Sequence, residues 1–176
     1  MKLRGPMMNR RALIRRSALL IGTILSAQAA TGCTPAPQEL LAAERNESGG
    51  IRLLIAPCPD FKMGGISVFV DDATAPKAKW ALMRESDANT PSQINLFSPP
   101  EGYKVNTATL TELQPSTPYS AVIRGSIGSD PLTGYADFSL EKIDKLSPGK
   151  VLVGPHGGKV VSRKGFLKSP PSACKK

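Results

Sequence analysis

The chain has 176 residues, 40% of them hydrophobic, and a formal net charge of +9, which suits one domain with appended segments. Residues 1–32 carry six basic and no acidic side chains, residues 33–144 nine basic and fourteen acidic, and residues 145–176 eight basic and none acidic. Because the middle of the chain is acidic, this distribution excludes a uniformly basic domain of the kind that binds nucleic acid.

The first segment has the composition of an export signal. Arginines lie between Arg10 and Arg16, an apolar run follows over residues 17–26, and small residues come after it. This order predicts a signal peptide over residues 1–32. The apolar run is shorter than the roughly 20 residues that a membrane-spanning helix needs. Residues 9–15 are also similar to a twin-arginine signal, so both export routes stay open.

Two cleavage positions are compatible with this signal. The triplet Ala27-Gln-Ala29 fits ordinary signal peptidase, which would release a soluble protein by a cut after Ala29 or Ala30. The stretch Ala30-Thr-Gly-Cys33 resembles the box of bacterial lipoproteins, with Ala30 where that family usually has Leu, Val or Ile. This resemblance implies that Cys33 is acylated and that the protein is held at a cell membrane or an outer membrane.

Residues 33–49 are polar and rich in Pro and Gly, which predicts a flexible tether with a short helical turn at residues 38–45. From residue 51 onward, short apolar runs alternate with turn residues. We expect strands at residues 51–56, 66–71, 79–84, 94–97, 104–110, 119–125 and 135–140. About seven short strands predict an all-β sandwich over residues 50–143.

One corner of this sandwich carries a more specific pattern. Leu113, Pro115, Thr117 and Tyr119, followed by an alternating strand, match the spacing L-x-P-x-T-x-Y. This pattern resembles the fibronectin type III family. The resemblance implies an immunoglobulin/fibronectin III-like sandwich in which the hydroxyl of Tyr119 binds the backbone of the corner. Trp80, on the third expected strand, is then a core residue.

The last segment, residues 144–176, is a basic extension. Two apolar runs flank the glycines at residues 154–158 and predict a short hairpin. We expect residues 162–176 to be disordered. Eight basic groups could lie on anionic lipid or on an anionic wall polymer, and a solvated tail is an equally good interpretation.

The chain has three cysteines. Because a disulfide uses two cysteines, an exported form leaves one cysteine without a partner in the same chain. If Cys33 carries lipid, Cys58 and Cys174 remain, and an oxidising compartment favours a disulfide between them. That bond would close a loop of more than a hundred residues and also hold the tail. The alternative is that Cys58 is a small buried apolar residue and Cys174 a free thiol.

Signals for chemistry are weak. His156 is the single histidine, and it lies among glycines without a nucleophile elbow, which favours a solvated loop residue over a catalytic one. The cysteines lack the spacing of a metal site. Asp71 and Asp72 are neighbours on an expected strand and would point to opposite faces, so they do not predict a calcium site. We therefore predict no catalytic residue, no metal and no cofactor.

Together these patterns predict a non-catalytic lipoprotein of the bacterial cell envelope, anchored through Cys33, whose sandwich binds an unidentified envelope protein or has a structural role. Nucleic acid is not an expected partner. Two alternatives stay open. One is a soluble secreted binding protein, periplasmic or extracellular, cut after Ala29 or Ala30. The other is a hydrolase or metal-dependent enzyme that uses His156.

Overall fold

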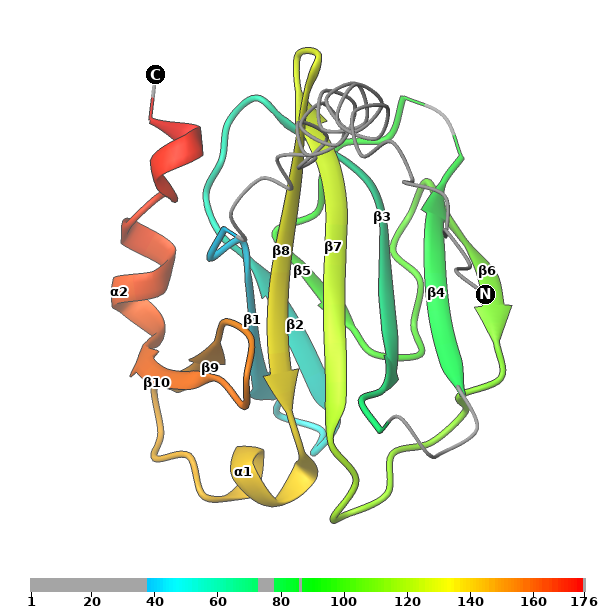
Figure 1. Ribbon diagram of the computed structural model, residues 1–176, viewed down its shortest axis with the longest axis vertical. Coiled ribbons are helices and arrows are strands. Elements are labelled where there is room, and N and C mark those ends of the chain that lie inside the picture. Colours follow the sequence, from blue (N-terminus) through cyan, green and yellow to red (C-terminus); the bar gives the residue numbers. More distant parts are fainter. Residues whose placement is uncertain (1–37, 73–77, 86, 176) are drawn as a thin grey trace, which may run out of the picture. The chain divides into compact units, whose positions relative to one another are not determined.

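The protein is an all-β sandwich in the part that the computed structural model describes, residues 38–72, 78–85 and 87–175 (Figure 1). These ranges hold ten strands and three short helices. The strands are β1 Leu41–Arg45, β2 Ile51–Ile55, β3 Phe61–Val70, β4 Lys79–Arg84, β5 Gln93–Asn95, β6 Tyr103–Ala108, β7 Tyr119–Ile127, β8 Asp130–Phe138, β9 Lys150–Val153 and β10 Lys159–Ser162. The helices are α1 Leu140–Asp144, α2 Arg163–Lys168 and the 3-10 helix η1 Ser172–Cys174.

The strands form two antiparallel sheets of five strands each. The first sheet has the order β10-β9-β1-β2-β5 and the second β6-β4-β3-β7-β8. All seven strands expected from the sequence are present, with ends shifted by a few residues, and the hairpin expected around residues 154–158 is the pair β9 and β10. The all-β sandwich expected from the sequence is therefore confirmed.

The main core lies between the sheets. Along β3 it follows the two-residue alternation of a strand, since Phe61 is 3% exposed and Met63 fully buried while Lys62 between them is exposed. The first five residues of β7, Tyr119 to Ile123, are all buried. Trp80 is a core residue, 2% exposed, as the sequence predicts. Each such large apolar side chain contributes about 1.5–3 kcal/mol to folding when it leaves water.

The expected tether is wrong over residues 40–45, and so is the expected helical turn. Leu41–Arg45 form strand β1, in the middle of the first sheet, where Leu41 lies opposite Ile55 of β2 and Ala43 opposite Leu152 of β9. Leu and Ala favour a helix by intrinsic propensity. Pairing on both edges and complete burial override that preference, since Leu40 to Ala43 are all 0% exposed.

The expected disorder of residues 162–176 is also wrong for the part that the structure describes, which ends at residue 175. Helix α2 starts after Ser162, whose side chain accepts a hydrogen bond from the backbone N–H of Gly165 at 3.0 Å. Phe166, 6% exposed, packs α2 on the outer face of the first sheet in a second apolar cluster with Ala42, Leu54, Ala56, Val151 and Val153. The folded unit therefore extends well beyond residues 50–143.

The outer edge of β8 is contacted from the first sheet at two points. Gln38 forms a parallel bridge with Gly134, and its N–H donates to the carbonyl of Thr133 at 3.1 Å. Gly154, at the end of β9, forms a second parallel bridge with Ala136. These bridges tie one side of the sandwich together across its two sheets.

Candidate functional site

A large hollow of the described surface lies at one end of the sandwich. It is a groove of about 1100 Å³ between three connections: the loop from β2 to β3, residues 87–92 before β5, and the turn from β7 to β8. Its lining contains acidic and basic side chains, among them Asp60, Lys62, Arg84 and Asp87. Loops held by a rigid sheet scaffold are where binding residues concentrate, so this groove is the candidate binding site.

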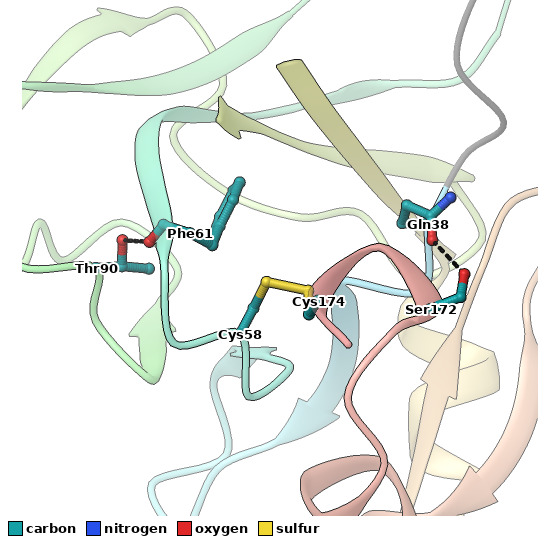
Figure 2. The surroundings of a disulfide bond; sticks show 6 residues. All are labelled: Gln38, Cys58, Phe61, Thr90, Ser172 and Cys174. Atoms are coloured by element: carbon teal, nitrogen blue, oxygen red, sulfur yellow. Dashed lines mark hydrogen bonds between the residues drawn. A yellow bond between two sulfur atoms is a disulfide. The ribbon is translucent and has the colours of Figure 1, made fainter. Parts of the chain in front are cut away.

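Hydrogen bonds fix two walls of the groove. The Thr90 hydroxyl donates to the carbonyl of Phe61 at 2.7 Å (Figure 2). The same hydroxyl accepts from the N–H of Met63 at 2.9 Å. The Tyr103 hydroxyl donates to the carbonyl of Met63 at 3.2 Å. Burial raises the pKa of Tyr103, and the nearby charge of Arg84 and a hydrogen bond with Thr90 oppose that rise. The loop before β5 is thus fastened to the start of β3.

The third element at this end is the predicted disulfide, which the structure confirms. Cys58, in the loop from β2 to β3, is bonded to Cys174 of η1 across a sequence separation of 116. Both cysteines are partly buried against the main core. The Ser172 hydroxyl donates to Oε1 of Gln38 at 3.3 Å, so the start and the end of the described chain meet (Figure 2).

The groove lining, as the structure describes it, contains no histidine, and its single cysteine is in the disulfide. The lining instead offers hydroxyls, an amide and charges of both signs, which are groups suited to hydrogen bonding and ion pairing with a ligand.

His156 lies away from this groove, in the turn between β9 and β10, where it is exposed and has φ +58°. A Ser–Asp pair lies next to that turn. Asp137 accepts from the hydroxyl of Ser120 at 2.6 Å and from the N–H of Gly157 at 3.4 Å, so its carboxylate holds the turn. The Lys142 ammonium donates to the carbonyl of Gly157 at 2.9 Å and fixes the same turn.

Asp71 and Asp72 follow β3 and are exposed. Among the described residues, no three His, Cys, Asp or Glu side chains come together in a way that could hold a metal ion. Within the same residues, none of the helices has the length and apolar character needed to cross a membrane. A disulfide is compatible with an exported protein.

The corner motif brings its residues together before β7. Tyr119 is 1% exposed, and its hydroxyl accepts a hydrogen bond from the N–H of Gln114 at 2.6 Å. The ring stacks on Phe138, with centroids 5.7 Å apart. Leu113 packs partly against the core, and Pro115 and Thr117 lie in the intervening turn, where the N–H of Thr117 donates to the carbonyl of Gln114 at 3.3 Å.

Seven basic groups of residues 145–175 are described, and of these Lys150 is exposed at the start of β9. Three pair with carboxylates: Lys145 with Glu141, Lys159 with Glu39, and Arg163 with Glu44. Lys164, Lys168 and Lys175 are exposed along α2 and after η1. The sequence did not indicate Thr90 or Phe166 as important residues. Ser162 followed by Gly165 and Phe166 is the one local signal that could have indicated the start of α2.

Comparison of the chain with protein-family models, with curated proteins and with solved structures found no match. Cys33, Ala29 and Ala30, which carry the processing and lipidation predictions, lie outside the described residues.

Proposed function

We propose that the protein is an exported lipoprotein, anchored to a bacterial membrane through acylated Cys33, whose sandwich is a non-catalytic binding module of the cell envelope. The observation that carries this proposal is the disulfide between Cys58 and Cys174. Such bonds persist in oxidising compartments outside the cytoplasm. With these two cysteines joined, Cys33 is the cysteine left over, and it follows a signal-peptide pattern directly.

We further propose that the sandwich is immunoglobulin/fibronectin III-like. Strands β1, β2 and β5 share one sheet and β4, β3, β7 and β8 the other, which parallels strands A, B, E and C′, C, F, G of that architecture. Tyr119 begins β7 and binds backbone five residues upstream, as the tyrosine corner of such domains does at strand F. Strands β6, β9 and β10 are then additions to the common set.

The groove supports a binding role. In immunoglobulin-like variable domains the B–C and F–G loops gather at one end and form the ligand site. The corresponding connections here, from β2 to β3 and from β7 to β8, line the groove of about 1100 Å³. The hydrogen bonds of Thr90 keep its walls in one arrangement, which lowers the entropy cost of binding a partner.

Intact mass spectrometry of the protein isolated from bacterial membranes tests the anchor. We expect a mature chain that begins at Cys33 and carries diacylglycerol and amide-linked acyl mass, because two or three acyl chains hold a protein stably in a bilayer. The matched control is Cys33→Ser, which should lack lipid and leave the membrane fraction. An unacylated N-terminus at Ala30 or Thr31 would instead identify a soluble secreted protein.

Photo-crosslinking in intact envelopes tests the binding module. A crosslinking amino acid at Asn89, in the groove lining, should capture a discrete partner. The same amino acid at Glu112, an exposed residue outside the groove lining, is the control. Identical products from both positions would contradict a binding role for the groove.

A further inference from the structure

We infer that Lys164, Lys168 and Lys175 form a membrane-contact surface that lies on anionic lipid headgroups. This inference rests on the proposed lipid anchor for its orientation, and the surface is named the lysine ridge below. The proposed partner of the basic C-terminal segment is therefore lipid, and not a wall polymer or solvent alone.

Chain length places the ridge near the anchor. Four residues separate Cys33 from Gln38, so an acylated Cys33 lies no more than about 18 Å from Gln38 even in a fully extended chain. Gln38 is fixed by its bridge to Gly134 and by its hydrogen bond with Ser172. Ser172 belongs to η1, which follows α2 directly. A chain anchored at Cys33 therefore enters the fold beside the C-terminal segment.

The ridge points away from the sandwich. On α2, Phe166 is buried against the first sheet, while Lys164 and Lys168 are exposed. Residues four apart lie on the same helix face, and a residue midway between them lies on the opposite one. The disulfide ties Cys174, and with it the neighbouring Lys175, to the loop from β2 to β3. Packing of Phe166 thus directs the two helical lysines outward.

The charges of the ridge are available for a partner. In the part of the chain that the structure describes, the ion pairs of the C-terminal segment involve Lys145, Lys159 and Arg163, and none involves a ridge lysine. A basic residue near an anionic bilayer contributes about 1 kcal/mol, or roughly fivefold in partitioning. Three such residues beside an acylated cysteine supply a second attachment in addition to the lipid chains.

Vesicle co-sedimentation of the unacylated fragment 34–176, with its disulfide formed, tests the inference. This fragment contains both sheets, the core and the disulfide, so it has what independent folding requires. We expect binding to vesicles with about one-third phosphatidylglycerol in phosphatidylcholine, and loss of that binding as salt rises toward about 1 M. Phosphatidylcholine vesicles alone should bind far less.

The variant Lys164→Gln/Lys168→Gln/Lys175→Gln should bind the anionic vesicles about a hundredfold more weakly. The matched control, Lys79→Gln/Lys104→Gln/Arg124→Gln, removes the same charge from the second sheet and should bind within about threefold of the unmodified fragment. Because all ridge lysines are exposed, the ridge variant should have the same thermal unfolding midpoint as the fragment.

Equal binding by the two triple variants would overturn the ridge, as would equal binding to neutral and anionic vesicles. Binding to soluble polyglutamate without binding to anionic vesicles would assign the ridge to an anionic polymer instead of lipid. The mass of Cys33 is measured separately on the full chain. An unacylated Cys33 would overturn the anchor but not the vesicle result, so the two proposals fail independently.

Discussion

The Nε of Arg163, at the start of α2, donates a hydrogen bond of 3.0 Å to Oε2 of Glu44 on β1, across a sequence separation of 119. Glu44 is 5% exposed and also accepts from Nε of Arg52 on the neighbouring strand at 2.7 Å. One buried carboxylate therefore holds two arginines from different segments and fastens α2 to the first sheet.

Replacing Glu44 by Gln should destabilise the fold by about 2 kcal/mol, because two partly buried guanidinium groups lose their carboxylate. The effect stays at this moderate level since solvent reaches both arginine side chains, which are 19% and 39% exposed. Urea unfolding measures it. Glu141→Gln, on the exposed surface of α1, should change stability by less than about 0.5 kcal/mol; a similar loss in both variants would contradict the role of Glu44.

Removing the disulfide with Cys58→Ser/Cys174→Ser should lower the unfolding free energy by about 3–5 kcal/mol. The bond closes a loop with a sequence separation of 116, and cross-linking a loop of this size restricts the unfolded chain by roughly that amount. Guanidinium unfolding gives the value, and the unmodified protein in reductant is the control. A variant as stable as the oxidised protein would show that the bond adds nothing to the fold.

Tyr119→Phe should cost about 1–2 kcal/mol, because the N–H of Gln114 loses its partner at 2.6 Å while the buried ring stays in place. Hydrogen exchange should show faster opening of residues 113–118 with unchanged protection in β3. Tyr135→Phe, a half-buried tyrosine on β8, is the matched control. Equal destabilisation by the two changes would argue against a special corner contact.

Tyr103 should make the fold sensitive to alkaline pH. Burial raises its pKa in the folded state, so the unfolded chain releases this proton at lower pH than the folded chain does. The stability from this group is complete below the unfolded pKa of about 10 and is lost as pH rises through the folded pKa. Tyr103→Phe should be less stable at neutral pH, by about 1 kcal/mol, and should lose less stability between pH 9 and 11.

The pH test uses unfolding free energies of both proteins at several alkaline pH values. Lysines titrate in the same range, so the slope difference between the unmodified protein and Tyr103→Phe is the relevant quantity. Parallel slopes would show that Tyr103 ionises equally well in the folded and unfolded chains.

Much of the fold could be predicted from local pattern. Strands such as Lys79–Arg84 and Tyr119–Ile127 are short apolar runs bounded by turn residues, and Phe61–Val70 alternates between buried and more exposed positions. Leu41–Arg45 could not be predicted in this way, since its composition favours a helix and its strand state depends on pairing with β2 on one edge and with β9, far along the chain, on the other. Helix α2 has only six residues, with Gly165 inside it, and depends on the packing of Phe166.

Part of the candidate site could likewise be predicted from the sequence, and part of it could not. Cysteine counting predicted the bond between Cys58 and Cys174, because three thiols in an exported chain leave few arrangements. The groove could not be predicted, because it forms where three connections converge and this convergence depends on the strand order of both sheets. Thr90 carries no sequence signal of its own, although its side chain joins two of those connections.

The contacts of Gln38 and Gly154 with β8 also bear on self-association. An outermost strand offers backbone groups to which a second molecule can add a strand, a common start of aggregation. Along β8 these two bridges occupy part of that edge. The second sheet ends on its other side at β6, where a bulge between Ala81 and Leu82 interrupts the pairing and bulges disfavour further strand addition. Both borders of this sheet thus discourage it from growing when many copies are crowded together.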